Sequence, residues 1–240
     1  MTSNAPPIAA DQLPRHIAVI MDGNGRWAQQ RSQPRAFGHH AGVRSARKVV
    51  KAAAEAGVEV LTLFAFSQEN WNRPEEEVSL LMRLFISTLK REIRQLSEHN
   101  LRWRFIGDHA SFSPELQKLM AETEAGSRRN TGMMLMVAVG YGGQWDIALA
   151  AARAAAEGVP ITPEAIQQRL STAGLPEVDL MIRTGGEIRI SNFLLWQIAY
   201  AELYFCDALW PDFSSAQLMD AIAWFGKRQR RFGRVPEAAQ

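Results

Sequence analysis

The sequence predicts an α/β protein, with an open, mainly parallel β-sheet flanked by helices in a single domain. Short apolar runs rich in β-branched residues alternate with longer stretches whose apolar residues recur at helical spacing. The first three are an apolar run over 16–21, a helical pattern over 38–56 and an apolar run over 58–66. Such strand–helix–strand units are nearly always right-handed crossovers between parallel strands. No linker, low-complexity tract or repeat divides the chain, so we expect one domain over 16–240 after a flexible N-terminus over 1–15.

The same alternation continues to the end of the chain. Pro74 followed by three glutamates is typical of a helix start, and the apolar stripe behind it predicts a helix to about His99. Beyond this helix we expect strands over 101–106, 132–141, 178–182 and 202–205, and helices over 114–128, from 142–143 to 157, from 162–164 onward and over 215–232.

Size and composition exclude several classes of protein. A net charge of +2 gives no basic footprint for nucleic acid. The single cysteine, Cys206, rules out an internal disulfide framework and fits a reducing compartment. The first fifteen residues lack the apolar core of a signal peptide, and no run reaches the ~18 apolar residues that span a bilayer. We therefore expect a cytoplasmic protein with no transmembrane segment and no nucleic-acid partner.

The strand over 16–21 ends in Asp22, Gly23, Asn24 and Gly25. Glycines at a strand exit let backbone N–H groups approach a ligand, and a helix start beyond them favours an anion such as a diphosphate. Asp22 adds a carboxylate able to bind a metal ion. Two plainer interpretations are a hairpin turn and a G-x-G-x-x-A dinucleotide fingerprint over 23–28. The hairpin is disfavoured because basic and aromatic residues precede the next apolar run.

Two further polar stretches, 67–74 and 183–192, each follow a predicted strand. Ligands of open α/β sheets bind at the carboxyl ends of the strands, so 67–74 and Asp22 are expected to face one pocket. The second stretch combines glycines, two arginines and a serine. Guanidinium groups bind phosphate bidentately, so this composition suits a diphosphate.

Five motifs occur in one order: Met21-Asp-Gly-Asn-Gly-Arg-Trp-Ala28, Gly38-His39-x-Ala-Gly42, Phe66-Ser-Gln-Glu-Asn-Trp-Asn-Arg-Pro74, Asp179-Leu-Met-Ile-Arg-Thr-Gly-Gly186 and Arg189-Ile-Ser-Asn-Phe193. Together they resemble the cis-prenyltransferase family, and within it the bacterial undecaprenyl diphosphate synthases. The resemblance implies a catalytic domain with an apolar tunnel between sheet and helices. It also implies repeated condensation of isopentenyl diphosphate with an allylic diphosphate, farnesyl diphosphate. The implied product is undecaprenyl diphosphate, the lipid carrier precursor for cell-wall polysaccharide.

The resemblance also assigns roles to single residues. Asp22 and Asn70 are implied as catalytic, with Asn70 as proton acceptor, although an amide is a weak base by its own chemistry. The implied contacts to the allylic diphosphate are Gly23, Asn24, Gly25, Arg26, Trp27, Arg35 and His39. Further substrate contacts are implied at Ser67, Gln68, Glu69, Trp71 and Arg73, and contacts to isopentenyl diphosphate at Arg183, Arg189, Ile190 and Ser191.

Mg²⁺ is the implied cofactor, held by Asp22 with a second contact from Glu202. One carboxylate can suffice, because Mg²⁺ keeps waters and binds substrate phosphates. The chain has no D-D-x-x-D segment, which counts against a trans-type prenyl synthase.

Other features of the family concern the tunnel and assembly. The candidate tunnel walls are Ala65, the face of 85–89 and the run 134–137. Arg231-Phe232-Gly233 resembles a segment that reaches across a dimer, which implies a homodimer. An apolar product also raises the expectation of peripheral membrane contact for its release.

Three alternatives stay open at this point. One is a synthase of shorter chains. Another is a nicotinamide-dependent oxidoreductase with Glu69 as the ribose-binding acid, which leaves 183–191 unexplained. The third is a non-catalytic partner subunit, although such a subunit need not keep Asp22, Asn70, Arg183, Arg189 and Glu202 together.

Overall fold

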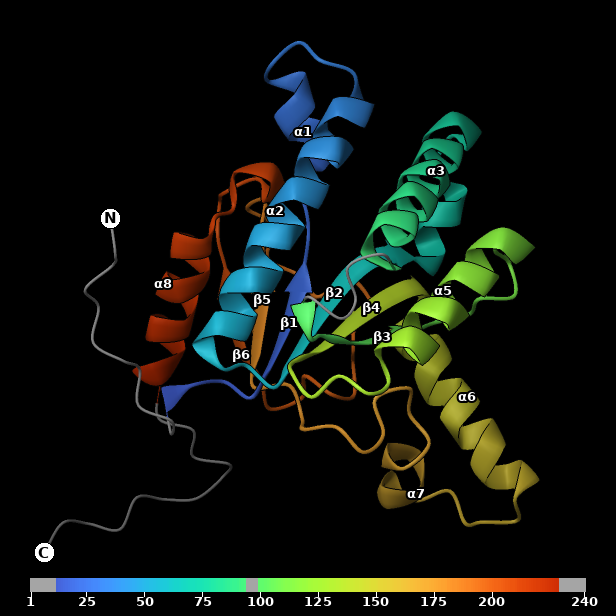
Figure 1. Ribbon diagram of the computed structural model, residues 1–240. Coiled ribbons are helices and arrows are strands. Elements are labelled where there is room, and N and C mark those ends of the chain that lie inside the picture. Colours follow the sequence, from blue (N-terminus) through green and yellow to red (C-terminus); the bar gives the residue numbers. More distant parts are fainter. Residues whose placement is uncertain (1–11, 94–98, 229–240) are drawn as a thin grey trace, which may run out of the picture.

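The computed structural model describes residues 12–93 and 99–228, which form a six-stranded sheet covered by helices on both faces (Figure 1). Every neighbouring pair of strands is parallel, so the predicted α/β class is confirmed and the sheet is wholly parallel. The order is β3-β4-β2-β1-β5-β6, with β1 His16–Ile20, β2 Val60–Ser67, β3 Arg102–Ile106, β4 Met134–Tyr141, β5 Leu180–Arg183 and β6 Glu202–Phe205.

Helices surround this sheet in two layers. One face carries α2, α3, α5 and α8, and the opposite face carries α6 (Figure 1). The bounds are α1 Asn24–Gln29, α2 Arg35–Ala56, the 3₁₀ helix η2 Gln68–Asn72, α3 Glu75–Glu92, α5 Pro114–Ser127, α6 Gly143–Ala156, α7 Pro163–Gln167, η4 Trp210–Asp212 and α8 Ser215–Gly226. Among the described residues, none of these helices combines the length and hydropathy needed to cross a membrane.

The sheet has an apolar core on each face, because the side chains of a strand point to the two faces in turn. Ile17 and Val19 of β1 pack into the core beneath α2, α3, α5 and α8. Ala18 and Ile20 belong to the core on the opposite face. Successive strand residues point to opposite faces, so a run that is apolar at every position must be buried on both sides, as in parallel sheets. This explains why 16–21 shows no polar alternation.

Several boundaries differ from the predicted ones. The sequence did not predict α1, and α2 begins at Arg35 rather than at residue 38. The last helix ends at Gly226, whereas 215–232 was predicted. A Cβ at Gly226 would lie 3.1 Å from the Cβ of Gln12, so this helix end packs closely on the N-terminal segment. The predicted continuation of α3 through 94–98, the N-terminal segment 1–11 and the dimer motif 231–233 lie outside the described residues.

His16 begins β1 as a fully buried side chain. Its Nδ1 lies 2.9 Å from the Pro176 carbonyl oxygen and its Nε2 lies 2.7 Å from Thr62 Oγ1. A carbonyl only accepts, so Nδ1 carries the proton and Nε2 accepts from the Thr62 hydroxyl. Burial lowers the pKa of His16 to about 4, although the Pro176 carbonyl opposes this shift.

The pKa of His16 predicts a loss of stability in acid. The unfolded chain binds this proton near pH 6.5 and the folded protein only near pH 4. The contribution is therefore complete above pH 6.5 and falls by about 3 kcal/mol as the pH drops through about 4. Urea unfolding at pH 7 and pH 4.5 is expected to show a smaller loss for His16→Gln than for the natural protein. Equal losses in the two proteins would contradict this assignment.

Candidate active site

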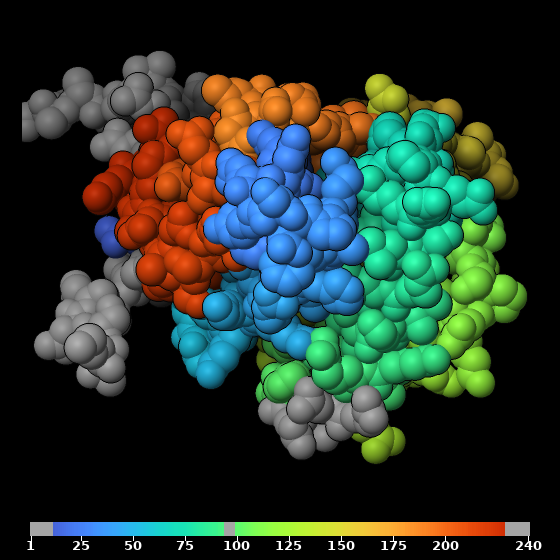
Figure 2. Space-filling view, turned by 90° about the horizontal axis from the view of Figure 1, so that it is seen from above, coloured from blue at the N-terminus to red at the C-terminus, as the bar shows by residue number. Residues whose placement is uncertain are grey.

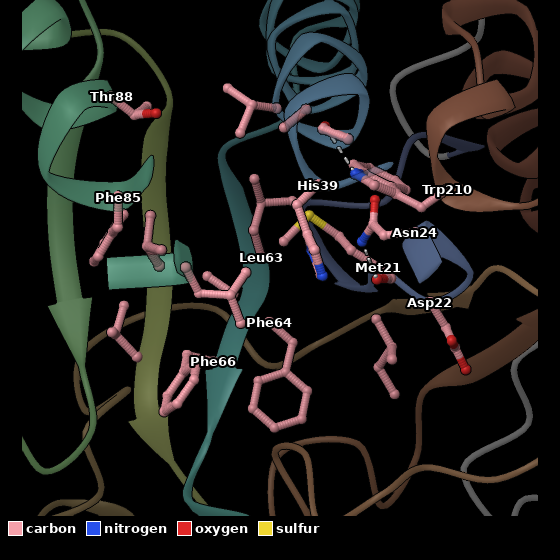
Figure 3. Close-up of a pocket in the computed structure, with 18 of the residues that line it drawn as sticks. Met21, Asp22, Asn24, His39, Leu63, Phe64, Phe66, Phe85, Thr88 and Trp210 are labelled. Atoms are coloured by element: carbon pink, nitrogen blue, oxygen red, sulfur yellow. Dashed lines mark hydrogen bonds between the residues drawn. The ribbon is translucent and has the colours of Figure 1, made fainter. Parts of the chain in front are cut away.

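A cavity of about 1420 Å³ lies between the sheet and helices α2 and α3. In Figure 2 the first part of α2 (blue) lies beside α3 (blue-green). Figure 3 shows Asp22 and His39 on one side of the cavity and Phe85 and Thr88 on the other. Its middle is apolar and is lined from two helices and two strands by Val43, Ala46, Val50, Leu63, Phe66, Leu81, Phe85, Leu135 and Val137.

Asp22 follows the carboxyl end of β1, where its backbone is fixed by Thr184. The Asp22 N–H donates to Thr184 Oγ1 at 3.0 Å, and the Thr184 hydroxyl donates to the Asp22 carbonyl at 2.8 Å. The Trp210 N–H donates to the same carbonyl at 2.9 Å. These bonds join the exits of β1 and β5 and orient the Asp22 side chain. Thr184 was missed from the sequence because its partner is 162 residues away.

The Asp22 carboxylate is held between two arginines. Its Oδ2 accepts from Arg183 Nη2 at 2.9 Å, and its Oδ1 lies 3.1 Å from Arg26 Nη2. Burial alone would raise the pKa of Asp22, but hydrogen bonds and charge from Arg183 and Arg26 lower it below its usual range. The side chain is 29 % exposed and lines the cavity. An ionised carboxylate therefore faces the cavity at its polar end.

The glycines of the first two motifs let α1 pack tightly beside Asp22. Gly23 caps α1 with a φ of 108°, and a Cβ there would lie 3.0 Å from the Leu209 backbone. A Cβ at Gly38 would lie 1.9 Å from the Asn24 carbonyl oxygen, and one at Gly42 would lie 2.2 Å from Asn24 Oδ1. The motif glycines of α2 are therefore explained by the close approach of α1, which brings Asn24 to the cavity wall.

Three of the predicted cationic contacts meet at one carboxylate, Glu77 of α3. Glu77 lies 3.0 Å from Arg35 Nε and from Arg73 Nη1, and 3.5 Å from His39 Nε2. Its side chain is only 11 % exposed. Burial lowers the pKa of His39, and the carboxylate of Glu77 only partly offsets this. In the sequence, Glu77 is one of three glutamates typical of a helix start. Its spacing of four residues from Arg73 was the signal that could have predicted their ion pair.

The segment after β2 turns into η2 under a capping box. The Ser67 N–H donates to Asn70 Oδ1 at 3.2 Å, and the Ser67 side chain accepts from the Asn70 backbone. Glu69 Oε1 accepts from Asn192 Nδ2 at 2.7 Å, which ties this segment to the loop after β5. Asn70 and Glu69 both line the cavity. The amide oxygen of Asn70 is thus already engaged by a backbone donor.

Arg183 organises the loop after β5. Its Nη1 donates to the Arg189 carbonyl at 2.6 Å and to Ser191 Oγ at 2.7 Å. The residue is 3 % exposed, and within the described residues its buried Nε has no hydrogen-bond partner. Buried polar groups are nearly always paired, so this donor fits an anionic ligand that the cavity would receive.

Most predicted site residues meet at this cavity. Those that line it are Asp22, Gly23, Asn24, Gly25, Arg26, Arg35, His39, Ser67, Glu69, Asn70, Arg73, Arg183, Arg189 and Ser191. Among the candidate walls, Ala65, Phe85, Leu135 and Val137 line it as well. Leu89 is instead fully buried core, and Met136 packs on the opposite face of the sheet, because strand side chains alternate.

Four predicted substrate contacts do not line the cavity. The Trp27 indole N–H donates to Asp212 Oδ1 at 2.7 Å, and the ring stacks on Phe37. The Trp71 ring packs on Phe66 and Phe112. The remaining two are Gln68, whose side chain lies against Gly142, and Ile190, which packs on the core of the opposite face.

Glu202 is not brought to Asp22. It is the first residue of β6, in register with Leu180, whereas Ile20 at the far end of β1 is in register with Arg183. Glu202 therefore lies at the amino edge of the parallel sheet and Asp22 beyond its carboxyl edge. Its Oε2 accepts from Arg228 Nε at 3.2 Å. Its role as a second metal contact stays a prediction. Within one chain, Glu202 and Asp22 lie at opposite edges of the sheet.

At the polar end of the cavity, Asp22 offers an oxygen ligand suited to a hard cation; Glu69 also lines the cavity, but its carboxylate accepts from Asn192. In the described part of the chain, no group of three or more His, Cys, Asp or Glu side chains could hold a metal ion. Mg²⁺ needs no such cage, because it takes one or two carboxylates and completes its shell with phosphate oxygens and water. Asp22, ionised and open to the cavity, has the chemistry required.

Comparisons with known proteins show the family of this chain. A profile described as “Putative undecaprenyl diphosphate synthase” matches residues 20–233. A ditrans,polycis-undecaprenyl-diphosphate synthase ((2E,6E)-farnesyl-diphosphate specific) of Pseudomonas aeruginosa is 56% identical, covering 95% of this chain and 94% of that protein. A protein of the same description from Aliivibrio fischeri is 53% identical, covering 97% of this chain and 93% of its own.

A solved structure extends the agreement to the fold. Lavandulyl diphosphate synthase from Lavandula x intermedia, in complex with dimethylallyl diphosphate, matches with a TM-score of 0.90 and 36% identity, over 93% of this chain and all of that one. Fold and site thus define a prenyltransferase of the parallel α/β type. The chain belongs to the undecaprenyl diphosphate synthase family, which confirms the resemblance read from the five motifs.

The dinucleotide-binding alternative has no support in this geometry. Residues 24–28 lie within the short helix α1, which Gly23 caps, rather than at the start of the long crossover helix of a nucleotide-binding unit. The crossover between β1 and β2 is made by α2, whose first residue is Arg35. Residues 183–191, which that alternative left unexplained, line the same cavity through Arg183, Arg189 and Ser191.

Proposed function

We propose that this protein condenses isopentenyl diphosphate repeatedly with farnesyl diphosphate to form undecaprenyl diphosphate, adding a cis double bond at each step. The observation that carries the proposal is Asp22, an ionised carboxylate between two arginines where a cluster of cations meets a long apolar cavity. Such a cavity offers charge for a diphosphate and apolar surface for a growing hydrocarbon chain. The family relatives named above carry this activity in their names.

The chain's residues suit two anions at neighbouring positions. Arg26, Arg35, His39 and Arg73 gather on the side of α1 and α2, where the allylic diphosphate would bind. Arg183, Arg189 and Ser191 form the other side, where isopentenyl diphosphate would bind. Asp22 touches both groups through Arg26 and Arg183. The two reactants would thus meet at one carboxylate, which holds them in reacting geometry.

In the reaction the allylic C–O bond breaks and the diphosphate leaves with the bonding electrons. The isopentenyl double bond then attacks the allylic carbon, and a proton is lost from the adduct to restore a double bond. Asp22 would hold Mg²⁺, which would supply positive charge against the charge that develops on the leaving group. Arg35 and Arg73 offer further positive charge there, and the apolar walls exclude water from the carbocation-like centre.

Asn70 acts in this scheme by position more than by basicity. Its Oδ1 already accepts from the Ser67 N–H, so the side chain is fixed in orientation. The amide can then orient a substrate oxygen. A diphosphate oxygen, which is the stronger base, accepts the proton.

The direct test is an assay with purified protein, farnesyl diphosphate, labelled isopentenyl diphosphate and Mg²⁺. We expect label in a lipid whose length corresponds to undecaprenyl diphosphate, and no product when EDTA replaces Mg²⁺. A shorter product would favour the short-chain alternative. No incorporation under any of these conditions would favour the non-catalytic subunit.

Assembly and location follow as parts of the same proposal. A homodimer is supported by two exposed apolar side chains, Leu203 in the edge strand β6 at 39% exposure and Tyr200 just before this strand at 71%. Edge strands are otherwise kept polar or covered, so a second copy is a natural partner. We place the protein in the cytoplasm, with peripheral membrane contact for product release. A monomer by light scattering at working concentration would contradict the dimer.

A further inference from the structure

The far end of the cavity is also polar. Along α2 the lining is apolar at Val43 and Ala46, and from Arg47 onward charged side chains alternate with Val50 and Ala54; α3 contributes Glu92. At the same end the cavity reaches the start of β3, at the amino edge of the sheet. The charged residues gathered there are Arg47, Lys51, Glu55, Glu92 and His99. The proposed reaction uses none of them.

Glu92 and Arg47 form an ion pair at this end. Glu92 Oε1 accepts from Arg47 Nη2 at 2.9 Å and from Arg47 Nε at 3.1 Å. Glu92 is 7 % exposed. Its carboxylate is held by the two guanidinium nitrogens of Arg47, and His99 Nδ1 lies 3.7 Å from its Oε2. On α3, Glu92 continues the stripe of Leu81, Phe85 and Thr88 that faces the cavity and ends it with a charge.

The same two helices are bridged at both ends of the cavity. Near the mouth, Glu77 of α3 pairs with Arg35 of α2. Arg47 lies roughly 18 Å farther along α2, and Glu92 roughly 22 Å farther along α3, at about 1.5 Å per residue. The apolar lining of α3 lies between these bridges, whereas that of α2 continues past Arg47 to Val50 and Ala54. A hydrocarbon chain anchored by its diphosphate at the mouth therefore extends toward the Arg47–Glu92 pair.

We propose that the Arg47–Glu92 ion pair is a polar barrier across the cavity that sets the length of the prenyl product. This rests on the proposed function. Each addition keeps the diphosphate at the cations of the mouth and moves the apolar tail one five-carbon unit deeper. Contact with apolar walls favours this movement, whereas displacing a buried carboxylate from its guanidinium partner opposes it. Elongation therefore slows when the tail reaches the pair.

The test replaces the pair with apolar side chains of similar size, Arg47→Met with Glu92→Leu. Such exchanges of buried ion pairs are often neutral or favourable for stability. We expect the products, measured by mass spectrometry, to be longer than those of the natural protein by at least one five-carbon unit. The rate of the first addition to farnesyl diphosphate is expected to stay within about twofold, because the mouth is unchanged. Glu92→Leu alone serves as a second variant if the double exchange unfolds, because the Arg47 side chain, 39% exposed, can be solvated without its partner.

Two controls make the result specific. The swap Arg47→Glu with Glu92→Arg restores an ion pair and is expected to keep the natural product length. Lys90→Met with Glu115→Leu removes a pair between α3 and α5 that does not line the cavity, and is expected to leave product length unchanged. Products of unchanged or reduced length from Arg47→Met with Glu92→Leu would overturn the inference, as would an equal shift in the Lys90 and Glu115 control. Absence of any product from the natural protein would instead defeat the proposed function.

Discussion

Replacing Asp22 with alanine is expected to lower kcat by about 10³-fold, the size of effect seen when an enzyme loses one preorganised group that stabilises developing charge. The diphosphate would lose the carboxylate that holds Mg²⁺, while Arg26 and Arg35 would still bind it. KM for farnesyl diphosphate is therefore expected to change little. Steady-state kinetics at saturating Mg²⁺ measure both quantities.

A matched variant separates this chemical effect from a structural one. Alanine leaves the buried Arg183 guanidinium without its carboxylate, whereas Asp22→Asn keeps an oxygen that can accept from Arg183 Nη2. Both variants are expected to lose activity, and Asp22→Asn is expected to lower the thermal midpoint less than Asp22→Ala. Turnover near the natural rate in Asp22→Asn would show that the charge of Asp22 is not needed.

Arg183→Lys is expected to lower kcat/KM for isopentenyl diphosphate by about 10² to 10³-fold, or roughly 3–4 kcal/mol. The Arg183 fork binds the Asp22 carboxylate, the Arg189 carbonyl and the Ser191 hydroxyl at once. A single ammonium cannot reproduce that geometry, so the loop over 184–192 would lose its anchor. KM for farnesyl diphosphate is expected to change less.

The control for this variant is Arg169→Lys. Arg169 is also largely buried, at 15% side-chain exposure, and pairs with Glu157 away from the cavity. A comparable loss of kcat/KM in Arg169→Lys would show that the effect of Arg183→Lys comes from general destabilisation. Binding of isopentenyl diphosphate by calorimetry gives an independent reading of the same contact.

The strands of the sheet and the polar segments that follow them could be predicted from the sequence. Apolar runs at 16–21, 58–66 and 178–182 are short, bounded by turn residues and buried on both faces, so their pattern could not be confused with a surface helix. Helix α1 was missed because its six residues carry a glycine and little apolar pattern, and because its stability comes from packing on Gly38 and Gly42. Such tertiary support leaves no local signal.

The site was predicted less completely, for a related reason. Asp22, Arg183 and Ser191 came together because strand ends share one edge of a parallel sheet. Glu77 escaped notice because two of its three partners, Arg35 and His39, lie on another helix. Glu202 was assigned by resemblance without its register. Motifs identify which residues matter, whereas register and burial decide which of them can meet within one chain.

The two ends of the cavity are joined by one uninterrupted helix, α2, which carries Arg35 and His39 at the mouth and Arg47 at the far end. One extra residue between His39 and Arg47 would rotate everything after it by about 100°. That rotation would carry Arg47 off its partner while leaving the mouth intact. Insertions into this segment are therefore compatible with the present architecture only in steps of whole helical turns.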